Sequence, residues 1–342
     1  MNDHAQGIDA TPGPKPFEAL WFSDGNVILA TDTYLFKVHK SMLSSQSSVF
    51  RDMFDLPLVG DSQGPSEGDR GIVPETYDGL PLVKLADEKG EELAYLLRAV
   101  YERQFYHRDD ARTPLKVVTS LLVLSTKYDF EHIRKDVIFQ ISKHYPMTLD
   151  EYCAIDDDKS QLFGMDRKDC HFPLLGAAFT AQVEPLLPIL YYAASHFYAG
   201  DIFQAFTSGT IAMECCKTLF NGRESLQSST NLSVASMRES LAQIRSLNKD
   251  KACQTQGCTL DVPDDHQTPF SSFLNTSDQK YVGGQQIIKS FFPQLCSNCF
   301  SECAKYAESE RSLTWAWIPM AFAHSKWEDI HKELEELLSE DV

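Results

Sequence analysis

The stretch FSDGNVILATDTYLFKVHKSMLSSQSSVFRDMF, Phe22 to Phe54, changes its hydrophobic period once, at His39. Before His39, Val27–Ala30 and Tyr34–Val38 are short runs rich in β-branched and aromatic residues, which favour strands. The Thr-Asp-Thr segment between them supplies turn chemistry, because these side chains bond their own backbone. After His39, apolar residues recur at three- and four-residue spacings, and Ser47 begins a Ser-Ser pair suited to an N-cap. The stretch therefore predicts a β-hairpin followed by two short helices.

The surrounding sequence predicts the rest of an N-terminal domain. Residues 82–85 read as a strand, and helices are expected over 93–101, from Pro114, and from about Asp129 to Tyr145. Residues 55–80 are crowded with Gly, Pro, Ser and acidic residues, so they predict a long, mobile surface loop. Residues 1–16 are polar and contain three prolines, so they predict a disordered lead-in.

The residues Asn26–Leu29, Phe36–Lys40, Leu43 and Ser47–Phe50 form an ordered signature that resembles the BTB (POZ) domain. The opening Asp24–Leu29 is most similar to the BTB family expanded in mushroom-forming fungi. The resemblance covers residues 17–146 and implies a non-catalytic protein-interaction module that dimerises or recruits a partner protein. The interaction face that it implies comprises Phe17, Leu20, Trp21, Val38, His39, Met42 and Leu43.

In many BTB proteins a second face binds a cullin scaffold for ubiquitin ligation. That use commonly involves an apolar-x-Glu motif after the second helix. The corresponding stretch here, Met53–Pro57, contains no Glu. The missing Glu weakens a role as a cullin-type substrate adaptor. That role is the alternative to simple dimerisation or partner recruitment.

Residues 147–342 predict a mostly helical C-terminal domain, so the expected fold class is α+β. The apolar segment 172–198 is divided by Pro185 and Pro188 into two helices. An amphipathic stretch over 203–247 is expected to break near Asn221-Gly222, and an acidic helix is expected over Trp327–Leu338. A cysteine-rich insert, residues 253–303, precedes the last helices.

The strongest chemical signal in this C-terminal half is two cysteine pairs, Cys253-x4-Cys258 and Cys296-x2-Cys299. A short spacing lets one turn present two thiolates, and a second pair completes the tetrahedron that a structural Zn²⁺ requires. Gly257 would ease the first of these turns. Cys303 and His266 are spare candidate ligands. The adjacent pair Cys215-Cys216 is expected to pack in the core, because neighbouring residues on a helix face different directions.

Composition limits the classes of function. The net charge of −18 disfavours nucleic-acid and anionic membrane surfaces, because both are bound mainly through Lys and Arg. No signal peptide or membrane-length apolar run is visible, so a cytoplasmic or nuclear protein is expected. No phosphate-binding loop, dinucleotide fingerprint or catalytic dyad appears, so no enzyme, cofactor other than Zn²⁺ or small-molecule substrate is expected. A transcription-associated zinc-binding regulator is the alternative from another class.

Overall fold

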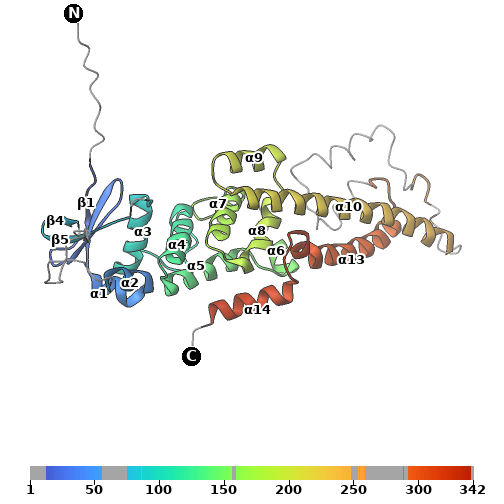
Figure 1. Cartoon of the computed structure of the whole chain (residues 1–342). Coiled ribbons are helices and arrows are strands. Elements are labelled where there is room, and N and C mark those ends of the chain that lie inside the picture. The colour runs from blue at the N-terminus through green and yellow to red at the C-terminus, as the bar shows by residue number, and fades with distance from the viewer. Residues whose placement is uncertain are drawn as a thin grey trace, which may run out of the picture. The chain divides into compact units, whose positions relative to one another are not determined.

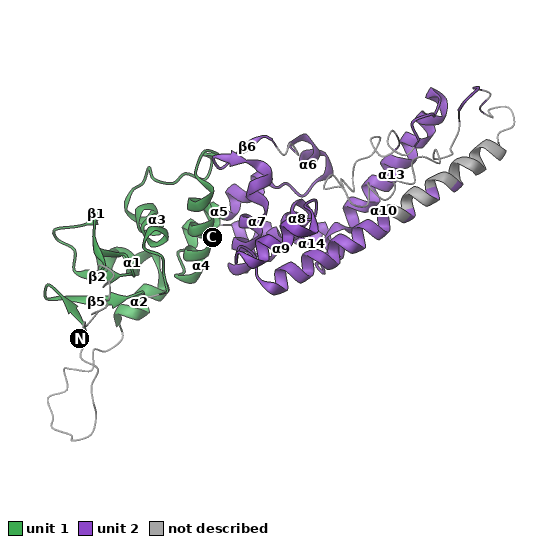
Figure 2. Cartoon of the chain, turned by 90° about the horizontal axis from the view of Figure 1, so that it is seen from above, with its two compact units in different colours: residues 1–137 green, residues 138–342 purple. Residues whose placement is uncertain are grey.

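The computed structural model describes residues 13–55, 75–85, 87–155, 159–247, 253, 255–258, 288 and 292–339 (Figure 1). A small sheet with helices comes first and a long helical region follows, so the predicted α+β class is confirmed. The chain separates into two compact units, residues 1–137 and 138–342 (Figure 2). The boundary between the two units lies within helix α5 (Glu131–His144), shortly before the domain boundary expected at residue 146.

Unit 1 contains a five-stranded sheet with the strand order β1-β3-β2-β5-β4. The predicted hairpin is present: β2 pairs antiparallel with β3, and Val27 lies opposite Val38. The hydroxyl oxygen of Thr31 accepts the N–H of Tyr34 at 3.1 Å, so the turn uses the side chain as expected. β1 pairs parallel with β3, and β5 pairs parallel with β2. The strands are β1 (Lys15–Trp21), β2 (Val27–Ala30), β3 (Tyr34–Val38), β4 (Thr76–Tyr77) and β5 (Leu80–Lys84).

The two predicted short helices follow the hairpin, and Ser47 separates them. Ser47 is 2% exposed, and its hydroxyl accepts the N–H of Phe50 at 3.0 Å and donates to the carbonyl of Tyr128 at 2.5 Å. One side chain therefore caps a helix and ties it to a segment 81 residues away. The helices of this part of the chain are α1 (Lys40–Gln46), α2 (Ser48–Asp55), α3 (Gly90–Tyr101), α4 (Leu115–Lys127) and α5.

Unit 1 has an apolar core. Six of its side chains are fully buried: Phe36, Leu43, Phe50, Leu97, Val118 and Leu121. Phe50 stacks on Tyr128, with ring centroids 5.0 Å apart. The C-cap residue of α4 thus packs against α2.

Two expected boundaries are wrong where the structure describes them. The loop expected over 55–80 ends earlier, because Thr76–Tyr77 forms β4 and pairs antiparallel with β5. Asp78 and Gly79 have φ of 50° and 77°, the positive values of a two-residue hairpin turn for which Asp-Gly is a strong signal. Residues 56–74 lie outside the described residues. The lead-in expected over 1–16 is also too long, since β1 begins at Lys15.

Where the structure describes it, unit 2 is mostly helical and contains a short hairpin. The apolar segment 172–198 provides its core: every residue of α8 is buried. The elements are α6 (Leu149–Ile155), β6 (Gln161–Leu162), β7 (Met165–Asp166), α7 (Arg167–Thr180), the 3-10 helix η1 (Glu184–Leu186), α8 (Leu187–Ala194), α9 (Ala199–Thr207), α10 (Met213–Leu247), α13 (Ser297–Ala321) and α14 (Trp327–Leu338).

The break expected near Asn221-Gly222 is wrong, because α10 is one continuous helix of 35 residues. A Cβ at Gly222 would lie only 2.1 Å from Cδ1 of Phe322 and 3.0 Å from the carbonyl oxygen of Ala321. Gly222 therefore permits a close helix contact and does not end the helix. The chain turns earlier, at residues 208–212, where Gly209 has a φ of 76°.

Two tryptophans fix α14 within unit 2. The rings of Trp315 and Trp327 stack with centroids 5.5 Å apart. The indole N–H of Trp327 donates to the carbonyl of Trp315 at 2.7 Å, and that of Trp315 donates to the carbonyl of Met147 at 3.0 Å. Both buried N–H groups are thus satisfied, which is the condition for burying an indole at low cost.

Candidate metal centre

The first cysteine pair is held by a tight turn. The backbone N–H of Cys258 donates to the carbonyl of Thr255 at 3.1 Å, which closes a four-residue turn. Gly257 stands at its third position with a φ of 84°, a value that L side chains rarely adopt. The expectation that Gly257 eases this turn is therefore confirmed. The turn contains Cys258, and Cys253 lies two residues before it.

The second pair opens helix α13. Cys296 is the residue before the first helical turn, with φ −69° and ψ 163°. Cys299 lies three residues later, on the neighbouring turn and the same side of the helix. The start of a rigid helix thus positions two sulfurs, while the Gly257 turn positions the other two.

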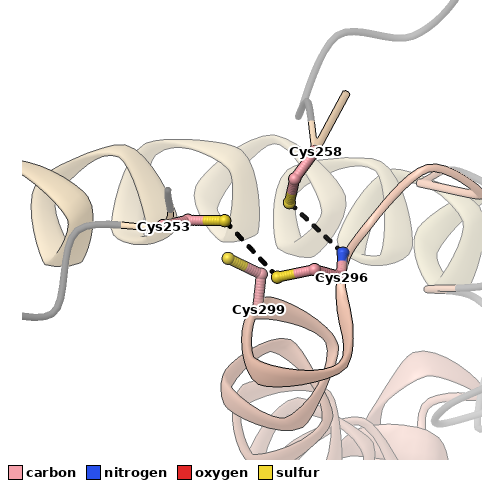
Figure 3. Close-up of side chains that lie close together, drawn as sticks. All are labelled: Cys253, Cys258, Cys296 and Cys299. Atoms are coloured by element: carbon pink, nitrogen blue, oxygen red, sulfur yellow. Dashed lines mark hydrogen bonds between the residues drawn. The ribbon is translucent and has the colours of Figure 1, made fainter. Parts of the chain in front are cut away.

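The four sulfurs converge (Figure 3). The Sγ atoms of Cys253, Cys258, Cys296 and Cys299 all lie within 4.8 Å of one another. Cys253 Sγ and Cys296 Sγ are 3.4 Å apart. In a tetrahedral site with Zn–S distances of about 2.3 Å, the sulfurs are about 3.8 Å apart. The predicted clustering is confirmed, and the spacing matches a metal of this size.

Backbone N–H groups stabilise the thiolate form of the cysteines. The N–H of Cys296 donates to Cys258 Sγ at 3.2 Å. The N–H of Cys299 and then the Cys253 thiol lower the pKa of Cys296 to about 6. The pKa of Cys253 is also lowered, chiefly by the N–H of Thr255. Because a metal binds the thiolate, each of these groups prepares the sulfurs for a cation.

Of the two spare candidates, the structure describes Cys303, which does not join the cluster. Cys303 is fully buried in an apolar cluster with Ile288, Phe292 and Ala307, so it serves as a packing residue. His266 lies outside the described residues. The pair Cys215-Cys216 is buried, as expected, and burial raises the pKa of Cys215 to about 11.

The interaction residues implied by the BTB resemblance divide by exposure. Leu20, Val38 and Leu43 are fully buried within unit 1, so their side chains are not exposed for contact with another molecule. Met42 is 38% exposed. Phe17, Trp21 and His39 are half-buried. Surface contact is therefore available to these last four side chains.

Polar contacts around His39 fix the start of α1. The Nε2 atom of His39 lies 3.2 Å from Asp24 Oδ1, and the backbone N–H of His39 donates to the hydroxyl of Tyr101 at 2.9 Å. The Oδ1 atom of Asn26 accepts the N–H of Lys40 at 2.8 Å. Asn26 thus satisfies one of the unpaired donors at the start of the helix, a role that the sequence alone did not indicate.

Among the described residues, no helix is both long enough and apolar enough to cross a membrane. No family model, no curated protein and no solved structure matches this chain.

Proposed function

We propose that the chain is a non-catalytic protein-interaction module with a BTB-like N-terminal unit and a helical C-terminal unit organised by one structural Zn²⁺. The proposal of a BTB-like N-terminal unit rests on the order of the helices and strands in unit 1. A hairpin (β2–β3) leads into a helical hairpin (α1–α2), then a strand (β5) and three helices (α3, α4 and α5). This is the order that a BTB domain implies, and it begins at the residues that carry the resemblance.

The exposed part of the proposed interaction face is small and apolar. Met42 is 38% exposed, and the half-buried rings of Phe17 and Trp21 belong to β1, one of the two edge strands of the sheet. An edge strand leaves backbone N–H and C=O groups available for another chain. Apolar side chains beside such an edge favour pairing with a second copy or with a partner protein.

Substitution of Met42 by Asp tests this role. We expect the charge to abolish self-association of the full-length protein, measured by analytical ultracentrifugation, or to release one class of partner captured from a lysate. Met165→Asp is the matched control, because Met165 is 36% exposed and lies in unit 2. The proposal fails if Met42→Asp and Met165→Asp behave identically in both assays.

The zinc part of the proposal follows from the four-sulfur cluster. Four cysteine thiolates fill every position of a tetrahedral Zn²⁺ and leave none for water or substrate, so the site is structural. The bound Zn²⁺ would join the Gly257 turn to the first turn of α13. Each cysteine pair belongs to one of these segments, so the metal would link the two. When bound, the metal supplies folding energy to this segment.

Metal analysis of the purified protein tests the zinc site. We expect one Zn²⁺ per chain, and none in Cys296→Ser. Cys153→Ser is the control, because Cys153 is exposed and lies outside the cluster. A chelator should increase hydrogen exchange around Cys296 and along α13 while leaving the unit 1 sheet protected. Zinc content unchanged in Cys296→Ser would contradict this assignment.

A further inference from the structure

A groove between α10 and α13 exposes apolar side chains in unit 2. The helices run side by side in both views (Figures 1 and 2), and Gly222 near the start of α10 contacts Phe322 just beyond the end of α13. The pair is therefore antiparallel. The groove has a volume of about 590 Å³ and is lined by Trp317, by Leu232 and Glu224, and by the small side chains of Ser225, Ser228 and Ser229.

An exposed leucine lies on each of the two helices. Leu232 on α10 is 69% exposed, and Leu313 on α13 is 61% exposed. Leu313 and Trp317 are four residues apart on one helix, so they share a face. Single exposed leucines are common, but two of them close to a groove that also contains Trp317 are a feature of interaction sites. The serines between them leave room for another element to approach the α10 backbone.

Two exposed carboxylates lie on the groove side of α10. Glu224 lines the groove and is exposed. Glu239 is also exposed, and it follows Asn221, another lining residue, by about five full helical turns, so it lies on the same side of α10. A second copy would place these carboxylates against their own equivalents, which disfavours self-association. A cationic partner would instead complement both the groove and the net charge of −18.

We propose that the α10–α13 groove binds an amphipathic helix of another protein, with an apolar face flanked by Lys or Arg. Apolar residues about one turn apart on the partner would contact Trp317 and, beyond it, the pair Leu232 and Leu313. Basic residues on the flank that faces α10 would lie near Glu224 and Glu239. Two helices with a groove between them offer the shape that an added helix fills. The groove contains no residue of the unit 1 sheet and none of the four clustered cysteines.

The experiment measures binding of a fluorescent probe peptide to the full-length protein by anisotropy. The probe is a designed helix of about 18 residues, five turns, with leucines on one face and lysines on the flanks. We expect Leu232→Ser combined with Leu313→Ser to raise the Kd about tenfold. Glu224→Gln combined with Glu239→Gln should also weaken binding and reduce its dependence on salt. Phe203→Ser, at a 59% exposed site on α9, is the control and should leave the Kd unchanged.

Three outcomes would overturn the inference. A scrambled peptide of the same composition could bind as tightly, which would make the attraction unspecific charge. The Leu232/Leu313 double variant could bind as the wild type does while retaining its circular dichroism spectrum. Light scattering could show a dimer of the chain that this variant dissolves, in which case a second copy occupies the groove.

Discussion

Substitution of Gly222 by Ala tests whether a close contact, and not a helix break, explains this glycine. In most helix interiors this change is favourable by about 1 kcal/mol, because Ala has the higher helix propensity. Here the new Cβ would lie 2.1 Å and 2.2 Å from two ring carbons of Phe322. A real Cβ does not approach other atoms so closely, so either the ring or the helix must move.

The ring has little freedom to move. Phe322 is 1% exposed and stacks on Tyr191 with centroids 5.3 Å apart and an angle of 15° between the rings. Overpacking of a well-filled interior costs about 1–3 kcal/mol. Because Phe322 is confined on both sides, we take the upper part of that range, and after the propensity gain we expect a net destabilisation of about 1–2 kcal/mol.

Urea denaturation of the full-length protein, followed by circular dichroism, measures the change in the free energy of unfolding. Gly200→Ala in α9 is the matched control, since a Cβ there meets nothing within 4 Å. That variant should gain about 0.4–1 kcal/mol. Gly222→Ala combined with Phe322→Leu should recover part of the lost stability. If Gly222→Ala stabilises the protein as Gly200→Ala does, the contact argument is refuted.

Two further predictions concern packing and pH. Phe50→Ala should cost about 3–5 kcal/mol in denaturant unfolding, because Phe50 is fully buried and leaves a cavity beside Tyr128; a loss below about 1 kcal/mol would show that the site collapses without cost. His171 is buried, and desolvation, with Arg167 nearby, lowers its pKa to about 3, so the folded protein holds it neutral. The unfolded chain protonates it below about pH 6.5, so its contribution to stability is complete above that pH and is lost as the pH falls towards 3. Between pH 6.5 and 5.5 the wild type should lose up to about 1.4 kcal/mol per pH unit more than His171→Gln, and parallel stability curves for the two proteins would contradict this.

The sequence alone determined the features that rest on local periodicity and turn chemistry. The change of period at His39 predicted the β2–β3 hairpin and the helices after it, because burial of one face imposes a two-residue or a 3.6-residue repeat. Ser47 marked a helix start, since few residues satisfy the first N–H groups. The two cysteine spacings and Gly257 identified the four-sulfur cluster, because a metal site requires short local turns.

Only the tertiary structure decided the features that depend on residues distant in the chain. Gly222 looked like a helix break, yet its contact with Phe322, 100 residues later in the chain, explains the glycine and leaves α10 intact. Asn26, just before β2, accepts the N–H of Lys40 at the start of α1 because the pairing of β2 with β3 brings the two residues together. Cys303 was a spare candidate ligand by sequence, but in the structure it packs against Ile288 and Phe292 and is not one of the four clustered cysteines. In each case local propensity allowed several outcomes, and long-range packing selected one of them.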